Sequence, residues 1–426
     1  MKILLVNKYH YIRGGTETYY FAIADGLRKL GHEVCFFSMK SDLNEPCPQE
    51  DYFVSEIDYN THHSTAENVR LAASLLYSFE AKRKFEELLK AEKPDIVHLN
   101  LVHRQISLSI LDAPSLRSIP VVFTAHDYNL VCPSYLMLDP SGNVCDDCIN
   151  GHYFRCIEKC CVKDSRVKST LAATEAYFLR KHGSYRKIKK IIAPSEFMKK
   201  KLLEGGFSPD KVVTMRNFAK NELISQDTIQ NKEPFFLYCG RLSKEKGVDI
   251  AVEAFLSIAE CLPPEWRLVI AGEGPELLTL KEVSSVSPHS CRIEYAGFLK
   301  SKEMRCLAER AAFCIASSRC RENMPYSVIE SFAASTPVLG SRIGGIPELV
   351  IEGHTGFLFE PGNANNLATC MVKAAKLDST RYEVMKRNCS NYVKTRCNQN
   401  GYMEELVKLY TSLLPGSGLV GYRVEK

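Results

Sequence analysis

The sequence contains no apolar run long enough to cross a membrane. No window approaches the roughly 18 to 20 apolar residues that a membrane-spanning helix needs. The opening residues, MKILLVN, hold only four consecutive strongly apolar residues before Asn7. A secretory signal carries about 7 to 15 such residues. We therefore expect a cytoplasmic protein that at most associates peripherally with the inner face of a membrane.

A strong excess of one charge is also missing. The 55 Lys and Arg residues nearly balance the 50 Asp and Glu residues, and the net charge of +5 gives no reason to expect a nucleic-acid partner. The sequence shows no heptad array, low-complexity tract or short-period repeat. With 426 residues, of which 45% are hydrophobic, the chain can build two or three conventional domains of roughly 100 to 200 residues each.

Cysteine, by contrast, is abundant, with 17 residues. Most lie singly inside apolar stretches such as EVCFF and AFCIASS, where a thiol behaves as a small buried hydrophobe. That pattern fits a reducing compartment better than a disulfide framework.

One cysteine-rich stretch, at about 132–161, stands apart from this pattern. Cys145 and Cys148 form a C-x-x-C pair, and Cys156 and Cys160 follow within a dozen residues. Four thiolates at such spacing can enclose a structural zinc ion. Reduced, unligated thiols and disulfides are the alternatives, and the spacing leaves all three open.

Short apolar runs alternate with helical patterns along the whole chain. The runs are continuous rather than alternating, as in KILLVN, PVVFTAH, FFLYCG and RLVIAGEG, which is typical of parallel strands covered on both faces. Two such series predict an α/β fold with two doubly wound, Rossmann-like domains and a ligand cleft between them. The expected segments are a first domain (1–217), a linker (218–234), a second domain (235–390) and a C-terminal helix and tail (391–426).

A glycine pair follows the first expected strand, in YIRGGTETYY. Gly14 and Gly15 allow a close approach of the backbone, and Thr16 can cap the helix that follows. Because ligands of open parallel sheets bind beyond the carboxyl ends of the strands, this loop can cradle a diphosphate, or it can be a plain tight turn. It is not a G-x-G-x-x-G fingerprint, so a nicotinamide-dependent dehydrogenase lacks its main support.

Two basic residues follow the first strand of the second expected domain, in FFLYCGRLSKEKG. Arg241 comes directly after the strand and its glycine, and Lys246 lies five residues on. Two fixed cations can neutralise a departing diphosphate without a metal ion, although a solvated surface loop is the alternative. Backbone groups around Phe298 and Leu299, in the turn YAGFL, could face a nucleobase or form an ordinary turn.

Two carboxylates flank an expected helix start in RENMPYSVIES. Pro325 suits the first helical turn, which leaves Glu322 just outside the helix and Glu330 more than a turn inside it. The free N–H groups of Tyr326 and Ser327 would attract an anion. The stretch could thus surround a phosphate-bearing ligand, with an acid on each side to hold hydroxyls. A surface helix with two solvated acids is the alternative.

A histidine ends the strand-like segment VVFTAH. His126 is followed at once by Asp127. A histidine at a strand end suits an active site, and a core histidine is the alternative.

Together these motifs resemble, in order along nearly the whole chain, the retaining GT-B glycosyltransferases of family four. The paired glutamates with GR and KG are the most specific part of the resemblance. The matching segments are GG at 14–15, AHD around His126, GRLSKEKG at 240–247, AGEGPE at 271–276, ENMPYSVIE at 322–330 and GGIPELV at 344–350.

The resemblance implies an enzyme that transfers a sugar from a nucleotide-sugar donor, held mainly by the second domain, to a glycan or lipid-linked acceptor on the first. No metal or other cofactor is implied for catalysis. Arg241 and Lys246 would bind the diphosphate, and Glu330 the ribose hydroxyls. Glu322 would contact the donor sugar, and His126 would lie beside it. The implied donor-binding residues are Gly15, Arg241, Lys246, Phe298, Leu299, Tyr326, Ser327 and Glu330, and the implied catalytic residues are Glu322 and His126.

One departure from the family pattern concerns donor choice. Many members read E-G-F/Y-G-L after the first glutamate, whereas this chain reads ENMPYS, so the donor of the commoner form cannot be transferred to it. A sugar-nucleotide epimerase or hydrolase on the same scaffold, and a non-catalytic nucleotide-sugar-binding subunit, are the other functions considered. Assembly of a cell-surface polysaccharide is the setting that the resemblance implies.

A basic segment covers residues 180–201. It carries nine Lys or Arg residues against one acid, Glu196. Such a segment, with aromatic neighbours, can settle on an anionic membrane surface, which would suit a lipid-linked acceptor. A merely solvated basic face is the alternative.

Overall fold

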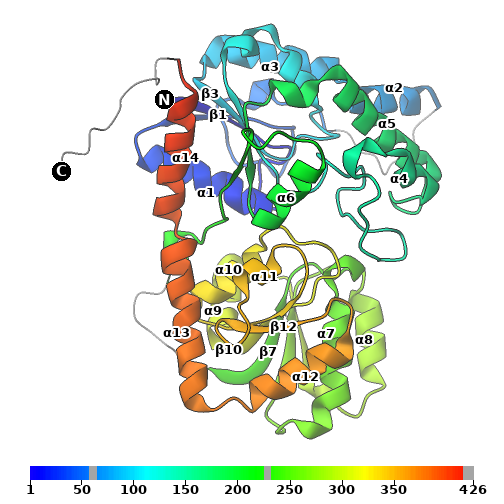
Figure 1. The fold of residues 1–426 in the computed structure, drawn as a ribbon, viewed down its shortest axis with the longest axis vertical. Coiled ribbons are helices and arrows are strands. Elements are labelled where there is room, and N and C mark those ends of the chain that lie inside the picture. The colour runs from blue at the N-terminus through cyan, green and yellow to red at the C-terminus, as the bar shows by residue number, and fades with distance from the viewer. Residues whose placement is uncertain (57–64, 225–231, 416–426) are drawn as a thin grey trace, which may run out of the picture. The chain divides into compact units, whose positions relative to one another are not determined.

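The computed structural model describes residues 1–56, 65–224 and 232–415. By its internal contacts the chain divides into two units (Figure 1). The first unit comprises Met1–Tyr135, Asp146–Met215 and the chain from Asn400 onward, and the second comprises Leu136–Cys145 and Arg216–Gln399. The centre of the expected linker, 225–231, and the C-terminal tail, 416–426, lie outside the described residues.

A six-stranded parallel sheet forms the centre of the first unit, in the order β2-β1-β3-β4-β5-β6. Its strands are completely buried where they are most apolar, as at Ile3 and Leu4, which is expected of strands covered on both faces. The order reverses at β1 and β3, the topological switch point of this sheet. The strands are β1 (Lys2–Val6), β2 (Glu33–Phe37), β3 (Ile96–Leu99), β4 (Val121–Thr124), β5 (Lys190–Ala193) and β6 (Val212–Thr214).

The helices of the first unit include α14, which comes from the far end of the sequence. The Tyr402 hydroxyl lies 2.6 Å from that of Tyr19, and the Tyr410 hydroxyl lies 2.5 Å from Nδ1 of His98 in β3. These buried hydrogen bonds fix α14 on the sheet. The α-helices are α1 (Gly15–Lys29), α2 (Thr65–Leu76), α3 (Phe79–Glu92), α4 (Phe154–Glu158), α5 (Arg166–His182), α6 (Glu196–Glu204) and α14 (Gln399–Leu413).

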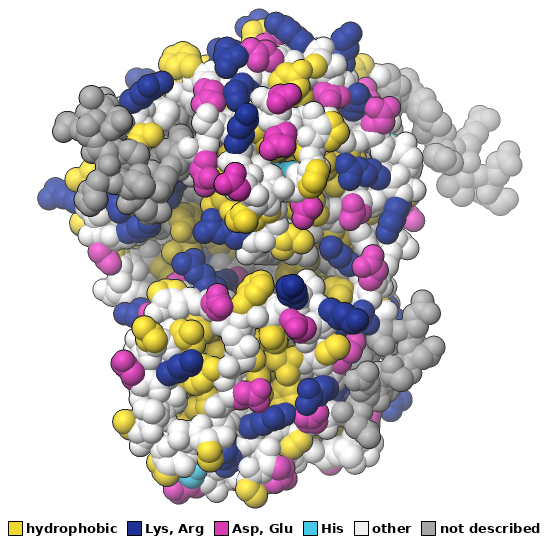
Figure 2. All heavy atoms as spheres, turned by 180° about the vertical axis from the view of Figure 1, so that it is seen from behind, with side chains coloured by type: hydrophobic (Ala, Val, Ile, Leu, Met, Phe, Trp, Pro, Cys, Tyr) yellow, Lys and Arg dark blue, Asp and Glu magenta, His cyan; other side chains and the backbone are white. Residues whose placement is uncertain are grey.

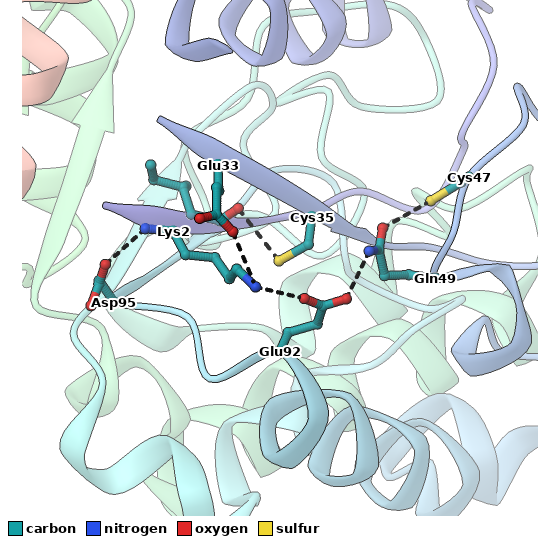
Figure 3. Close-up of polar contacts among 8 residues, drawn as sticks. Lys2, Glu33, Cys35, Cys47, Gln49, Glu92 and Asp95 are labelled. Atoms are coloured by element: carbon teal, nitrogen blue, oxygen red, sulfur yellow. Dashed lines mark hydrogen bonds and ion pairs between the residues drawn. The ribbon is translucent and has the colours of Figure 1, made fainter. Parts of the chain in front are cut away.

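Charged side chains form hydrogen bonds and ion pairs at the amino edge of this sheet, away from the carboxyl ends of its strands (Figure 3). The Lys2 ammonium donates a hydrogen bond to Glu92 over 3.0 Å and lies 3.3 Å from Glu33. Gln49 donates to the other oxygen of Glu92 over 2.8 Å, and the Lys2 backbone N–H donates to Asp95 over 2.7 Å. This network has a structural role, because it joins the start of β1 to α3 and β2.

A second six-stranded parallel sheet, in the order β12-β11-β10-β7-β8-β9, forms the centre of the second unit. Its order reverses at β7 and β10. The two parallel sheets confirm the predicted α/β class with two doubly wound units. The strands are β7 (Glu233–Cys239), β8 (Arg267–Ala271), β9 (Ile293–Gly297), β10 (Ala311–Ala316), β11 (Val338–Ser341) and β12 (Gly356–Phe359).

The helices of the second unit enclose two apolar clusters, one on each face of the sheet. Phe236 and Phe313 belong to one cluster and Phe235 and Cys314 to the other, as the alternating faces of adjacent strands require. The α-helices are α7 (Val248–Ile258), α8 (Leu277–Ser285), α9 (Ser301–Arg310), α10 (Tyr326–Ala333), α11 (Ile346–Leu349), α12 (Ala364–Ala375) and α13 (Ser379–Arg396).

A short hairpin, Leu136–Cys145, belongs to the second unit although the chain on both sides of it belongs to the first. Met137 in this hairpin is buried and has a φ of 52°. The Arg321 guanidinium lies 3.8 Å from the Met137 sulfur and donates to the Cys145 carbonyl over 3.4 Å. The first half of the cysteine-rich stretch therefore packs beside the residue that precedes Glu322.

The surface carries charges of both signs. On the face that Figure 2 shows, Lys and Arg side chains are interspersed with Asp and Glu, as the near balance of charges leads one to expect. Within the described residues, no helix combines the length and the apolar character needed to span a bilayer.

Candidate functional site

The carboxyl edge of the second sheet brings together the loops that follow β7, β8, β10 and β11. Glycine allows this close packing. A Cβ atom on Gly272, where φ is 143°, would lie 1.9 Å from the Gly240 carbonyl oxygen, and one on Gly274 would lie 2.2 Å from that of Leu242. The predicted glycine turns after β7 and β8 are thus in direct backbone contact, and they form one surface beside the switch point, where ligands of such sheets bind.

Lys246 and Glu322 form an ion pair across the switch point. Lys246 ends a single 3₁₀ turn, Lys244–Lys246, after β7, and Glu322 follows β10. The Lys246 ammonium lies 2.5 Å from Oε1 of Glu322, and the Ser318 hydroxyl donates to the same oxygen over 2.6 Å. The structure therefore places two of the predicted site residues in direct contact.

The electrostatics of this pair keep both groups charged. Burial would raise the pKa of Glu322, but Lys246 and the hydrogen bond from Ser318 outweigh burial and hold that pKa below its usual value. Burial would likewise lower the pKa of Lys246, yet Glu322 raises it. The Glu322 side chain is only 14% exposed and that of Lys246 36% exposed, so the ammonium is the more accessible partner.

The predicted GGIPELV motif fixes the backbone of Glu322. The Gly345 N–H donates to the Glu322 carbonyl over 2.7 Å. Gly344 has a φ of 59°, and a Cβ atom there would lie 2.2 Å from the same carbonyl oxygen. Glycine at 344 is therefore required both by the backbone conformation and by the space.

Glu330 differs from Glu322 in having no partner among the residues that the structure describes. As predicted, α10 begins at Tyr326 after Pro325, so that Glu322 lies before the helix and Glu330 within it. The Glu330 carboxylate is half-buried and makes no hydrogen bond or ion pair with the described residues. Burial raises its pKa to about 7, although Lys220 opposes the shift. A half-buried carboxylate in this state can accept hydrogen bonds from a ligand.

The remaining predicted residues of the second unit differ in how exposed their side chains are. The Arg241 side chain is exposed and has no partner among the described residues. Phe298 is 71% exposed, whereas Leu299 packs against the apolar cluster beneath the sheet. Tyr326 and Ser327, the first residues of α10, are half-buried. All five lie in strand-end loops or at the helix start, where a ligand can reach them.

Sequence reasoning missed two contributors to this edge of the second sheet. Ser318 donates to Glu322, and Arg319 forms two hydrogen bonds, of 2.6 and 2.7 Å, with Asp249 at the start of α7. Both residues belong to the polar run SSR, which follows the apolar part of AFCIASS. Their position directly after a predicted strand was the signal that could have identified them.

In the first unit, the glycine pair leads directly into a helix at the switch point. Helix α1 begins at Gly15, which is exposed, and Gly14 is its N-cap residue. The expectation that Thr16 caps this helix is wrong, because Thr16 lies inside the first turn and no side chain caps it. The first N–H groups of α1 are therefore left without a side-chain cap, which suits an anionic ligand.

His126 lies at the carboxyl end of β4 and is held in one tautomer. Its Nε2 lies 2.9 Å from Oδ1 of Asn100, and the ring packs edge-on against Tyr19 at 4.9 Å between centroids. Burial lowers its pKa to about 3, so the ring is neutral at physiological pH. Because Nε2–H donates to the amide oxygen, Nδ1 carries the lone pair and can accept a hydrogen bond from a sugar hydroxyl.

Further buried charges surround this edge of the first sheet. Burial raises the pKa of Asp127, and its carboxylate accepts hydrogen bonds from the backbone and side chain of Asn129. Glu175 of α5 lies 3.8 Å from Arg104, and burial raises the Glu175 pKa to about 7. Arg104, which sequence reasoning missed, has a φ of 72° and donates to the Pro133 carbonyl over 2.6 Å. A strained backbone of this kind often marks a functional loop.

The cysteine-rich stretch shows no metal site. Cys148 and Cys156 are buried in a small apolar cluster with Tyr153. Within the described part of the chain, no group of three or more His, Cys, Asp or Glu side chains is placed to hold a metal ion. The structure therefore gives no support to a zinc ion at Cys145, Cys148, Cys156 and Cys160.

The basic segment 180–201 is divided among several elements. Lys201 is buried and pairs with Glu204 and Asp146 at 2.7 and 3.1 Å, and Lys187 pairs with Asp112. Part of its charge is therefore neutralised locally. The exposed basic residues are Arg180, Lys181, Arg186, Lys187, Lys189 and Lys200.

Two family models match the chain, one for each unit. The model for Glycosyltransferase Family 4 matches residues 13–220, and the model for Glycosyl transferases group 1 matches residues 219–393. Together they span most of the 426 residues.

Individual relatives have low sequence identity to this chain, but some of them match it over most of its length. An uncharacterized glycosyltransferase of Methanocaldococcus jannaschii is 23% identical over 367 residues, which cover 86% of each chain. The lipopolysaccharide 1,2-N-acetylglucosaminetransferase of Salmonella typhimurium is 26% identical over 219 residues, 46% of this chain and 56% of the relative. The crystal structure of HepE from Anabaena in complex with UDP has a TM-score of 0.66 at 16% identity, covering 97% of this chain and all of HepE. HepE has also been solved with UDP-glucose. At such identity the structural likeness shows the fold alone.

Proposed function

The chain belongs to the group 1 glycosyltransferases of the GT-B fold, and from this membership we propose that it transfers a sugar from a nucleotide-sugar donor to a glycan or lipid-linked acceptor with retention of anomeric configuration. The process that this activity would serve is the assembly of a cell-surface polysaccharide. Relatives named for lipopolysaccharide and colanic acid synthesis support that setting.

The observation that carries the proposal is the arrangement of charges at the switch point of the second sheet. The accessible ammonium of Lys246 forms an ion pair with the ionised carboxylate of Glu322. A second carboxylate, Glu330, lies on α10 and has no partner in the described part of the chain. A donor diphosphate needs a cation, and the sugar and ribose at its two ends need hydrogen-bond acceptors. One ammonium and two carboxylates in these positions meet that need.

Each residue then has a distinct role. Lys246 and the exposed Arg241 bind the diphosphate and stabilise the charge that develops when the bond to the sugar breaks, without a metal ion. Glu330 accepts hydrogen bonds from the ribose hydroxyls, and Glu322 holds the donor sugar. The backbone amides of Tyr326 and Ser327 and the turn at Phe298 and Leu299 complete the donor site. In the first unit, the Gly15 amide contacts the donor phosphate, and Nδ1 of His126 accepts a hydrogen bond from the transferred sugar.

We take uridine as the first base to test, because HepE, which has the same fold, has been solved with UDP and with UDP-glucose. We further propose that the acceptor binds to the first unit. We also propose that the protein acts in the cytoplasm at the inner face of the membrane, where a lipid-linked acceptor would be presented.

The test measures nucleotide release from UDP-, GDP- and ADP-sugars, with and without an extract of lipid-linked acceptors. The wild type is compared with Glu322→Gln, and Glu253→Gln, an exposed glutamate on α7, is the matched control. Release should need the acceptor and select one base. It should fall by about 100- to 1000-fold in Glu322→Gln, because a charged group that acts on the transition state is lost, and it should stay unchanged in Glu253→Gln.

Other outcomes would point elsewhere. Release that needs no acceptor would favour a sugar-nucleotide hydrolase, and conversion of the sugar without release would favour an epimerase. Binding of one donor without turnover, even in the presence of the acceptor extract, would favour a non-catalytic subunit. The stereochemistry is read from the anomeric proton of the product by NMR, and an inverted product would contradict retention.

A further inference from the structure

A cavity of about 330 Å³ opens at the amino edge of the first sheet. It lies where α5 and α6 end and where β5 and β6 begin. The candidate residues of this unit, Gly15 and His126, lie instead at the carboxyl edge of the same sheet. The cavity is therefore separate from the residues to which the proposed function assigns roles.

The lining of this cavity is positively charged. It includes Arg180, Arg186 and Lys211 and no Asp or Glu residue. The Arg186 side chain is exposed and has no partner among the described residues, and Arg180 is hydrogen-bonded to the Tyr153 hydroxyl rather than to an acid. Burial lowers the pKa of Lys211, and Arg186 contributes to the same shift. Asp210, which precedes Lys211 in the sequence but does not line the cavity, opposes this shift.

Helix ends provide an alternative reason for some of these charges. Basic residues in the last turn of a helix complement its negative end, and Lys211 donates to the carbonyls of Arg186 and Ile188 over 3.0 Å each. However, a helix C-terminus carries only about half a negative charge. The carboxyl ends of α5 and α6 together thus offset about one of the three positive charges on the cavity lining. Arg186 lies after the end of α5 and not in its last turn.

The backbone holds the two arginines at the cavity. Gly183 and Gly206 follow α5 and α6 with φ values of 75° and 87°, which allows both helices to end sharply at the opening. Gly151 has a φ of 89°, which favours glycine, and a Cβ atom there would lie 2.7 Å from Nη1 of Arg180. Arg180 therefore lies against Gly151 and is also hydrogen-bonded to the Tyr153 hydroxyl.

The other wall of the cavity is aromatic. The rings of Tyr185 and Phe207 lie 5.7 Å apart between centroids, and the Tyr185 hydroxyl lies 3.3 Å from Nε2 of His103. Tyr153 is buried on the same lining. Cations beside apolar rings suit an anionic group that is attached to an apolar or aromatic portion.

We propose that this cavity binds a phosphate-bearing ligand, with the phosphate between Arg180 and Arg186 and the attached apolar portion against Tyr185 and Phe207. Guanidinium groups bind phosphate oxygens through paired, charge-assisted hydrogen bonds. The phosphate could come from a phospholipid headgroup or from a soluble phosphorylated compound. The exposed lysines near the opening, among them Lys181 and Lys189, would raise the local concentration of either.

The experiment measures binding of the full chain to two probes. The first probe is vesicles of phosphatidylcholine with or without phosphatidylglycerol, followed by flotation, and the second is inorganic pyrophosphate, followed by titration calorimetry. The variants are Arg186→Gln and the double variant with Arg180→Gln, and Lys200→Gln on α6 is the matched control outside the cavity. Thermal unfolding checks that each variant is folded, and Arg186→Gln alone decides the matter if the double variant unfolds.

Binding to at least one probe should weaken by about tenfold or more in Arg186→Gln, since a charged hydrogen bond is lost, and should stay within about twofold in Lys200→Gln. Loss with anionic vesicles alone identifies a lipid headgroup, and loss with pyrophosphate identifies a soluble ligand. Equal binding by wild type and Arg186→Gln, or no binding at all, overturns the proposal. So does pyrophosphate binding that disappears in Lys246→Met but not in Arg186→Gln, because it would belong to the second unit. None of these results depends on transferase activity.

Discussion

The carboxyl edges of the two sheets differ in how they carry charge. In the second unit, Lys246 and Glu322 are both ionised, because each supports the charge of the other against burial. In the first unit, burial dominates: it keeps His126 neutral and raises the pKa of Glu175 to about 7. Fixed charges suit a diphosphate, whereas neutral hydrogen-bonding groups suit sugar hydroxyls. The difference therefore matches the division of labour that we propose between the units.

The largest effect is expected from Lys246→Met. Loss of this ammonium removes the cation at the switch point and the main opposition to burial at Glu322, so the pKa of Glu322 should rise even though the hydrogen bond from Ser318 remains. We expect kcat/KM for the donor to fall by about 100-fold or more. Lys244→Met, in the same 3₁₀ turn but with an exposed side chain, should leave the rate within about twofold. Similar losses in both variants would show that general positive charge, not the pair, matters.

A second comparison separates backbone conformation from crowding. Gly344 and Gly353 have φ values of 59° and 70°, but a Cβ atom on Gly353 would meet nothing within 4 Å. Gly353→Ala should lower the free energy of unfolding by about 1 kcal/mol, from its conformation alone. Gly344→Ala should cost about 2 kcal/mol more, because the new methyl collides with the Glu322 carbonyl. Urea denaturation measures both, and equal losses would show that the loop moves aside without cost.

The sequence predicted those features that depend on local pattern. Continuous apolar runs such as KILLVN identified buried parallel strands, and Pro325 located the start of α10 within one residue. The GR, KG and paired-glutamate motifs also selected the pair that the structure brings into contact, Lys246 and Glu322.

Features that depend on contacts between distant segments could not be predicted in this way. Thr16 is a residue type that often caps helices, but the N-cap residue of α1 is Gly14, two residues earlier. Arg104 gains its importance only because β3 ends beside Glu175 of α5, more than sixty residues away in the sequence. The hairpin around Met137 likewise packs on the second unit through Arg321. None of these contacts can be recognised from the spacing of the residues along the sequence.

The Glu330 carboxylate of the second unit should make donor binding depend on pH. Glu330 has a pKa of about 7, so it is mostly protonated at pH 6 and mostly ionised at pH 8. If it accepts hydrogen bonds from ribose, the affinity for an intact nucleotide-sugar should rise by about tenfold across this range, since charged acceptors bind more strongly. The diphosphate diester itself does not titrate there. Calorimetry at several pH values should show the rise in wild type and a flat profile in Glu330→Gln.

At acidic pH, the smallest effect is expected from Glu175→Gln in the first unit. In the folded state the Glu175 pKa is about 7, above the unfolded value of about 4.3, so the folded protein holds a proton that the unfolded chain has lost between these values. The contribution of this group to stability is therefore full below about pH 4 and is lost as pH rises towards 7. Glutamine resembles the protonated form and should leave the free energy of unfolding at pH 4 within about 0.5 kcal/mol of the wild-type value. At pH 8 the variant should be the more stable protein in urea denaturation, whereas Glu45→Gln, at an exposed site, should follow the wild type at both pH values. A variant that loses stability at pH 8 would show that the ion pair with Arg104 outweighs burial, and the contrast between the two edges would then disappear.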